Sequence, residues 1–342
     1  MKSFAGLDVS QQETQICVVS DDGEVLFEGK CSTEPGEIAK SLKKHASGLV
    51  RAVLETGSMS GWLTKELEKA GIPAVCICAR QAHGVLKGKP HKSDRNDALM
   101  LARMAHANLL TPVYVRSVDA HEKKALVKIR GRLVSTRAAM VNAIRGHLKP
   151  FGIRLGKVKA SDFERRVLEL AADFPHLRAG LDSLLTIRAR LSEEIELLDD
   201  RLLALAKEDA VCRSLMTLPS VGALAAVTYT SVIDDPGRFK NSAQIANYLG
   251  LTPRRYQSGE TDYSGRISKT GDTVLRHLLY ECANILIAIV KKDCALKRWA
   301  MQLQERVGAK KARTAVARKL AVLMYKVWKS GEEFDWNRGL AA

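Results

Sequence analysis

Near its N-terminus the chain reads Phe4-Ala5-Gly6-Leu7-Asp8-Val9-Ser10, the first element of an α/β pattern. Its mostly apolar residues predict a strand, and two further strands are predicted over 15–20 and 25–31, joined by the turn Asp21-Asp22-Gly23. An isolated acid within an apolar strand is costly unless it is paired or bound to a metal ion. Asp8 therefore marks the first strand as a place for chemistry.

Outward from this strand, the chain alternates between helix and strand signals. Helices are predicted over 37–45 and 60–70, strands over 49–54 and 74–78, and a further helix begins after Ser93, a good N-cap residue. Three strands, helix, strand, helix, strand, helix is the order of a ribonuclease-H-like domain. We predict this α/β domain for residues 1–118.

The rest of the chain reads as helical, so the fold class is α/β plus α. Residues 119–210 contain two long helical segments, 120–148 and 181–205, and the leucine spacing of the second favours a coiled-coil hairpin that links two domains. Residues 211–342 predict a mainly helical domain. It begins with the turn Leu218-Pro219-Ser220-Val221-Gly222, which resembles a helix–hairpin–helix, and it contains a polar loop over 251–271.

The charge of the chain points to a polyanionic partner. The 342 residues carry a formal net charge of +16, and residues 119–166 alone hold 13 basic and 4 acidic side chains. Such segments neutralise phosphates, so DNA or RNA is the first partner to consider. A basic surface that only aids solubility is the alternative, and a membrane surface is a weaker one. The longest conspicuous apolar run, Ile285 to Val290, is too short to cross a bilayer.

The compartment follows from the cysteines and the N-terminus. The seven scattered cysteines show no zinc-binding spacing, which favours buried thiols in a reducing cytoplasm. Met1-Lys2 leads directly into the first strand, so we expect no signal peptide.

Four acids of the N-terminal domain form a candidate metal site. Asp8 lies in the first strand, Glu55 ends the fourth, and Asp94 and Asp97 are three apart on one face of the last helix. In a ribonuclease-H-like domain these elements meet, and all-oxygen ligands suit Mg²⁺ or Mn²⁺. Taken singly, Asp94 could be a first-turn acid, Asp97 a partner of Arg95 or Arg103, and Glu55 a surface residue.

Several motifs together resemble the insertion-sequence-110 family of bacterial transposases. They are Gly6-Leu7-Asp8-Val9-Ser10, Leu54-Glu55-Thr56-Gly57, Ser93-Asp94-Arg95-Asn96-Asp97-Ala98, Leu218-Pro219-Ser220-Val221-Gly222, Gly250-Leu251-Thr252-Pro253, Ser258-Gly259 and Ser268-Lys269-Thr270-Gly271-Asp272. The resemblance implies a RuvC-like domain with an Asp-Glu-Asp-Asp tetrad, a coiled-coil linker and a C-terminal transposase domain. It also implies a recombinase guided by a structured non-coding RNA, the bridge RNA.

The resemblance further implies a serine nucleophile in the C-terminal domain, and Ser258 matches it best, with Ser264 and Ser268 as rivals. Basic residues around Ser258 could engage phosphates, although Glu260 and Asp262 reduce the positive charge of this strip. The candidates for nucleic-acid contact are Arg254, Arg255, Arg266, Lys269 and Arg276, together with Lys128 and Arg132 of the basic segment 119–166.

We therefore expect a DNA transposase or recombinase in the bacterial cytoplasm, associated with the nucleoid. The serine of one domain must meet the carboxylates of another, which favours a homo-oligomer, a dimer that pairs into a tetramer on DNA. One alternative is a metal-dependent nuclease for DNA junctions that uses water and no serine. A second alternative is a non-catalytic nucleic-acid-binding protein.

Overall fold

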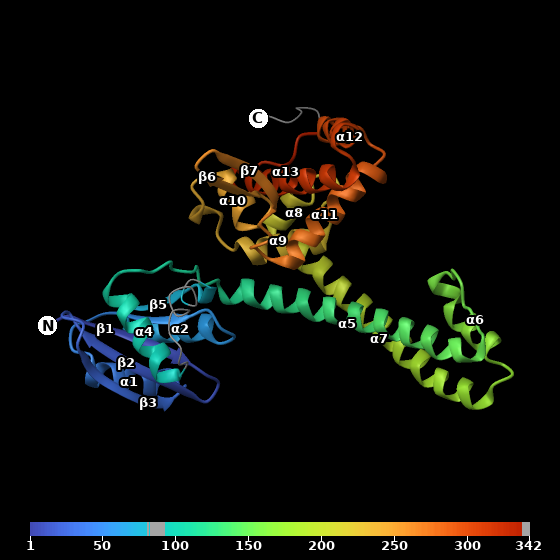
Figure 1. The fold of residues 1–342 in the computed structure, drawn as a ribbon. Helices are drawn as coiled ribbons and strands as arrows, with labels where there is room; N and C mark the ends of the chain where they lie inside the picture. Colours follow the sequence, from blue (N-terminus) through green and yellow to red (C-terminus); the bar gives the residue numbers. More distant parts are fainter. Residues whose placement is uncertain (81, 83–92, 337–342) are drawn as a thin grey trace. The chain divides into compact units, whose positions relative to one another are not determined.

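The computed structural model describes residues 1–80, 82 and 93–336 (Figure 1). These residues form two compact units, Met1–Arg116 and Ser117–Ala342. The sequence predicts three regions, with boundaries at 118 and 210. The structure has no division at 210, because Leu202 and Ala206 pack in one hydrophobic cluster with Cys212, Tyr229 and helices farther along the chain.

The first unit is built on a mixed five-stranded sheet with the strand order β3-β2-β1-β4-β5. The first three strands form an antiparallel meander, and β4 and β5 extend the sheet parallel to β1. The mixed α/β character and the predicted succession of elements are confirmed. The elements are β1 (Ser3–Val9), β2 (Glu13–Ser20), β3 (Val25–Ser32), α1 (Pro35–His45), β4 (Leu49–Glu55), α2 (Ser60–Lys69), β5 (Ala74–Ile77) and α4 (Asp94–His106).

The two faces of this sheet are covered by different helices (Figure 1). Leu7 and Ile16 point to the face that packs against α1 and α2. Phe4 and Cys17 point to the opposite face, which packs against α4. Because successive side chains of a strand alternate between faces, Asp8 belongs to the face that α4 covers.

The second unit begins with two long helices that lie side by side, with α6 near their far end (Figure 1). The helices run antiparallel, since Lys123 pairs with Asp209 and Arg130 with Asp199. The first helix ends before Pro150, where predicted. The elements are α5 (Val118–Leu148), η1 (Lys149–Phe151), η2 (Ala160–Asp162), α6 (Phe163–Leu170) and α7 (Pro175–Glu208).

The remainder of the second unit is mainly helical, as expected. Its buried core includes Tyr229, whose hydroxyl donates a hydrogen bond to the carbonyl of Ala321 at 2.8 Å. The 218–222 turn joins the first two helices, with Ser220 at a φ of 68°. The elements are α8 (Ala210–Leu215), α9 (Ala223–Ile233), η3 (Pro236–Arg238), α10 (Ser242–Tyr248), β6 (Pro253–Ser258), β7 (Thr261–Ile267), α11 (Thr273–Ala288), α12 (Ala295–Val307) and α13 (Ala309–Ser330).

The prediction of a polar loop over 251–271 is wrong for most of its length. Strands β6 and β7 pair there as an antiparallel hairpin. The two residues between them form a tight turn, and Gly259 adopts a φ of 54° that favours glycine. Every residue of β6 is exposed, so the hairpin has no buried face that would produce an alternating pattern.

Two observations bear on the environment of the chain. Among the described helices, none is both long and apolar enough for a bilayer span. All seven cysteines are free thiols, and burial raises the pKa of Cys17 and of Cys282 to about 11.

Candidate active site

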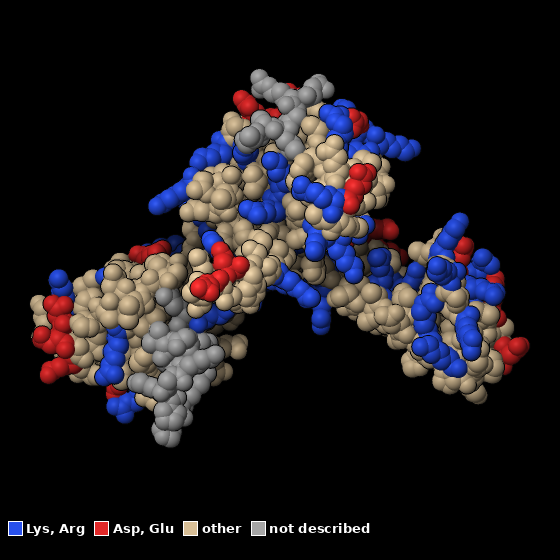
Figure 2. All heavy atoms as spheres, turned by 45° about the horizontal axis from the view of Figure 1, so that its top comes forward, with Lys and Arg blue, Asp and Glu red and all other residues tan. Residues whose placement is uncertain are grey.

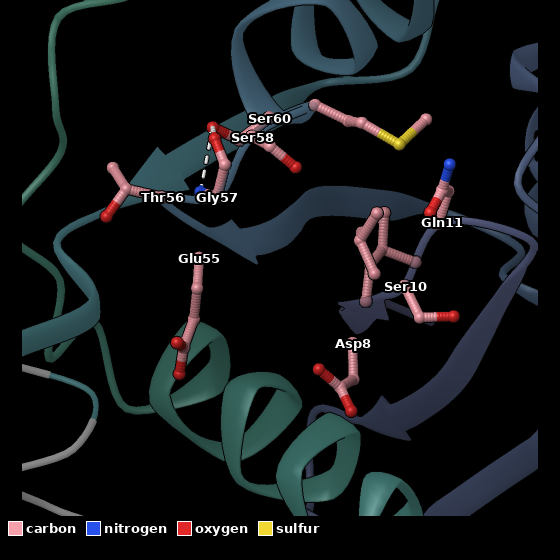
Figure 3. A pocket seen from close by; sticks show the side chains of 11 residues that line it. Asp8, Ser10, Gln11, Glu55, Thr56, Gly57, Ser58 and Ser60 are labelled. Atoms are coloured by element: carbon pink, nitrogen blue, oxygen red, sulfur yellow. Dashed lines mark hydrogen bonds between the residues drawn. The ribbon is translucent and has the colours of Figure 1, made fainter. Parts of the chain in front are cut away.

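Asp8 and Glu55 lie on neighbouring parallel strands at the edge of one cavity. Leu7 of β1 pairs with Leu54 of β4, and the two acids are the next residues on each strand. Both line a cavity of about 250 Å³, which Ser10, Gln11 and residues 56–60 complete. Both carboxylates point toward the helix α4 (Figure 3). The strand ends thus place two half-buried carboxylates on one side of the sheet.

Gly6 brings α4 against β1. A Cβ atom at this position would lie 2.1 Å from the carbonyl oxygen of Ala98 and 2.3 Å from the amide nitrogen of Ala102. At its C-terminal end the same helix sets the ring of His106 against that of Phe4, with centroids 5.3 Å apart. The helix therefore runs antiparallel to β1.

This direction determines where the acids of α4 lie. Asp8 is two residues beyond Gly6, about 7 Å along the strand. About four residues of a helix span a similar distance. Counted from Ala98 toward the N-terminus of α4, they reach the first turn, which contains Asp94 and Asp97. Ser93 caps this turn, its hydroxyl accepting a hydrogen bond from the amide of Asn96 at 3.3 Å. The structure thus brings the first turn of α4 to the level of Asp8.

The four acids are not gathered into one closed group. Asp94 makes a long ion pair of 4.0 Å with Lys30, which lies in the same cross-strand row as Gln15 and Asp8. Arg95, beside it, pairs with Glu28 of β3. Within the described ranges, no three His, Cys, Asp or Glu side chains are close enough to hold one metal ion. Two of the predicted ligands share a cavity, and the other two lie on the helix opposite.

Ser258 is the last residue of β6 and lies beside the turn of the hairpin, opposite Thr261. Its side chain is exposed and makes no hydrogen bond within the described part of the chain. Ser264 lies opposite Arg255, which places it on the other face of the hairpin from Ser258. The hydroxyl of Ser268 shares a hydrogen bond of 3.1 Å with that of Thr270.

The basic residues predicted around Ser258 have different surroundings. Arg254, Arg266 and Lys269 are exposed. Arg255 is also exposed, but its Nε and one terminal nitrogen donate to the two carboxylate oxygens of Asp262, at 2.9 and 2.6 Å. Hydrogen bonding to Arg255 lowers the pKa of Asp262. Asp262 therefore neutralises the arginine next to it.

Arg276 does not face solvent, and we correct its assignment. Its side chain is only 9% exposed, and one guanidinium nitrogen donates to the carbonyls of Leu249, at 3.2 Å, and Gly271, at 2.5 Å. Burial lowers the pKa of Arg276, and the charge of Asp272 opposes this. Since Leu249 precedes the hairpin and Gly271 follows it, Arg276 holds the base of the hairpin in place.

On the long helical pair, Lys128 and Arg132 are exposed on α5 and have no ion pair within the described residues. Exposed Lys149, Arg154 and Lys157 follow at the end of α5. On the face drawn in Figure 2, Lys and Arg side chains gather at the end of this helical pair. Three other basic residues of α5, Lys123, Lys124 and Arg130, are neutralised by acids: Lys124, for example, pairs with Asp272 at 2.7 Å.

One basic cavity was not predicted. Arg137 and Arg145 of α5 and Arg188 of α7 line a cavity of about 640 Å³, together with Phe163. The guanidinium of Arg188 lies 4.7 Å from the centre of the Phe163 ring. The sequence indicates that α5 is basic. It does not show that Arg188, more than forty residues after Arg145, lines the same cavity.

Two transposase family models match this chain. A family model for transposases, DEDD_Tnp_IS110, matches residues 5–152. A second, described as the transposase IS116/IS110/IS902 family, matches residues 212–300.

Relatives extend the match to nearly the whole chain. The transposase for insertion sequence element IS1111A of Coxiella burnetii is 30% identical, over 94% of this chain and 88% of the relative. A probable family 20 transposase of Pseudomonas aeruginosa is 28% identical over 94% of this chain and 96% of the relative. A pilin gene-inverting protein of Moraxella lacunata is 28% identical over 35% of this chain and 38% of its own length. The chain therefore belongs to the IS110 family of transposases, enzymes that transfer DNA strands.

Proposed function

We propose that this chain cuts and rejoins DNA strands of an insertion sequence, with Asp8, Glu55, Asp94 and Asp97 as metal ligands and Ser258 as nucleophile. The observation that carries the proposal is the placement of the acids. Asp8 and Glu55 line one cavity, and the first turn of α4 bears the other two at the level of Asp8.

The donor set suits a divalent cation. Four carboxylates supply only oxygen, the ligand type that Mg²⁺ and Mn²⁺ favour. A bound divalent cation would neutralise the acids and stabilise the charge that develops on the attacked phosphate. Asp94 would have to exchange its 4.0 Å pairing with Lys30 for the metal, and an exposed pair of this length is weak.

The serine step exchanges one phosphate ester bond for another, so the bond energy is kept for rejoining the strands. The Ser258 oxygen attacks phosphorus and loses its proton, while the bond to one deoxyribose oxygen breaks and that oxygen leaves as a hydroxyl. A deoxyribose hydroxyl of another strand then attacks the phosphoserine and releases Ser258. The exposure of Ser258 at the hairpin turn, next to Gly259, supports close approach to a backbone phosphate.

Phosphate contacts would come from the exposed cations. Arg254, Arg266 and Lys269 flank the proposed nucleophile, and Lys128 and Arg132 extend the basic surface along α5. Base pairing with a bridge RNA would then select the DNA, because such side chains bind backbones without reading sequence. The 218–222 turn, with its helix–hairpin–helix-like sequence, and the coiled-coil-like helical pair belong to the same proposed nucleic-acid surface.

The chemistry requires a hydroxyl from one compact unit and carboxylates from the other. A homo-oligomer, a dimer that pairs into a tetramer on DNA, would supply both. The relative named as a pilin gene-inverting protein supports a role in DNA rearrangement. For this chain, the DNA would be that of the bacterial nucleoid.

The test is covalent capture of DNA. The full chain is incubated with Mg²⁺, its guide RNA and DNA that carries the element ends, and adducts are resolved on a denaturing gel. We expect an adduct for the parent and for Ser264→Ala, but none for Ser258→Ala or Asp8→Asn. An adduct that survives in Ser258→Ala but not in Ser268→Ala would move the nucleophile to Ser268.

Two other outcomes correspond to the alternative functions. If Ser258→Ala still cleaves DNA and no adduct forms with any variant, the chain is a junction nuclease that uses water. If Asp8→Asn changes no DNA reaction and the parent binds no divalent cation, the chain is a non-catalytic nucleic-acid-binding protein.

A further inference from the structure

Two tyrosines stack in solvent on the β6–β7 hairpin. Tyr256 and Tyr263 are directly opposite in the strand register. Their ring centres are 5.0 Å apart and their planes differ by 19°, yet the residues are 45% and 56% exposed. Aromatic rings are normally buried for their large apolar area, so a stacked pair left in solvent indicates a surface for another ring.

The pair is held ready on the hairpin. Gly265 lies under the ring of Tyr256, since a Cβ there would be 3.1 Å from the ring atom Cε2. The ring of Tyr256 therefore lies close to Gly265 and is stacked with that of Tyr263. Arg276 fixes the base of the same hairpin through the carbonyls of Leu249 and Gly271. A preorganised aromatic surface binds a ring at lower entropic cost than two mobile side chains would.

The tyrosines lie on the same face of the hairpin as Ser258. Tyr256 and Ser258 are two apart on β6, about 7 Å along the strand, and each points to the same side. Arg255 and Asp262, which neutralise each other, lie on the opposite face. The face with the tyrosines therefore combines a nucleophilic hydroxyl with two exposed rings.

The surrounding charge identifies the kind of ring. Arg254, Arg266 and Lys269 are exposed on and beside the two strands, without an ion pair in the described part of the chain. Basic side chains interleaved with exposed aromatics are what proteins use to bind single-stranded nucleic acid, where bases stack and phosphates pair with cations. Paired bases inside a duplex do not offer their faces to such a surface.

We propose that Tyr256 and Tyr263 form a stacking platform for an unpaired DNA base next to the phosphate that Ser258 attacks. The inference rests on the proposed function, because it takes DNA as the strand at Ser258. The platform would hold the nucleotide adjoining the scissile phosphate, so that the backbone reaches the hydroxyl in one orientation.

The experiment measures stacking directly. A single-stranded DNA oligonucleotide with one 2-aminopurine, whose fluorescence falls when it stacks, is titrated with the full chain. We expect quenching with the parent and with Ser258→Ala. Tyr263→Leu should weaken single-strand binding by roughly 5- to 150-fold and abolish quenching, because one base–aromatic stack is lost.

Matched variants separate stacking from folding. Tyr263→Phe keeps the ring and should bind like the parent, and Tyr114→Leu removes a tyrosine that is 40% exposed in the other unit. All of these variant proteins should bind duplex DNA as tightly as the parent does. Their own melting temperatures should also equal that of the parent protein. If Tyr263→Leu binds and quenches like the parent, the platform is refuted.

The platform and the proposed function fail in different ways. Quenching without any covalent adduct in the parent would leave the platform standing and refute the serine mechanism. A covalent adduct in the parent without any quenching would support the serine mechanism and refute the platform. The fluorescence of 2-aminopurine in an RNA strand of the same sequence is measured as well. If it falls on binding and that of the DNA strand does not, Tyr256 and Tyr263 bind the guide RNA, and the assignment to DNA is overturned.

Discussion

Gly6 is the residue whose substitution tests how the carboxylates are brought together. In Gly6→Ala the new Cβ would meet the Ala98 carbonyl oxygen at 2.1 Å and the Ala102 nitrogen at 2.3 Å. Carbon atoms make favourable contacts at about 3.5–4 Å. Both obstructing atoms belong to the backbone of α4, so no change of rotamer relieves them.

The size of the effect follows from the distances. The helix α4 must retreat from β1 by roughly 1 Å or more, and overpacking of this kind costs about 1–3 kcal/mol of unfolding free energy. The same movement carries Asp94 and Asp97 away from Asp8. A misplacement of about 1 Å in a catalytic arrangement can cost about 100-fold in rate.

Two measurements on the full chain check this. Guanidinium unfolding followed by circular dichroism should show a lower midpoint for Gly6→Ala, and strand cleavage in Mg²⁺ should slow by about 100-fold. Gly36→Ala, on α1 of the same unit, is the control, because nothing lies within 4 Å of its Cβ position. A Gly6→Ala protein that unfolds and cleaves like the parent would refute the close packing of α4 on β1. Reduced stability with an unchanged rate would remove the first turn of α4 from the site.

Three further changes have definite expected results. Arg276→Met should lower the unfolding free energy by about 1–3 kcal/mol in thermal melts, because the carbonyl of Gly271 loses its donor, whereas the exposed Arg254→Met should not. Asp209→Ala should cost about 0.5–2 kcal/mol at neutral pH, because the carboxylate caps α8 and pairs with Lys123. Burial tends to raise the pKa of Asp209, but hydrogen bonds from Lys123 and two backbone amides leave it lowered; the contribution is therefore present above about pH 4 and lost below it, and denaturant titrations of parent and variant should converge in acid. Chelation of divalent cations should stop strand cleavage, and added Mg²⁺ or Mn²⁺ should restore it; cleavage that persists in chelator would contradict a carboxylate metal site.

The sequence was most informative where an element packs into the core. Strands β1 and β2 and the helix α4 were predicted from their apolar residues, and these residues are buried between the sheet and its helices. The hairpin β6–β7 was missed for the opposite reason, since β6 is exposed on both faces. Its pairing depends on the turn at Gly259 and on cross-strand partners such as Tyr256 and Tyr263.

The predictions for the candidate site also succeeded for some residues and failed for others. Asp8 and Glu55 stood out as acids in or at the end of apolar strands, and the structure places both at one cavity. Arg276 was predicted to contact phosphate from its charge alone. Its burial and its bonds to two carbonyls follow from the packing of α11 on the ends of the hairpin, which its local sequence does not reveal.

The succession of strands and helices in the first unit, the family, and the acids and serines available for chemistry can all be recognised from the sequence. These depend on local periodicity and on residue type, which a single chain displays directly. The folded chain was needed to see that Gly6 lets α4 reach β1, that Asp94 pairs with Lys30, and that Tyr256 stacks on Tyr263 near Ser258. Each of these depends on contacts between segments that are separate in the sequence, and such contacts are set by how side-chain volumes and strand registers fit together in space.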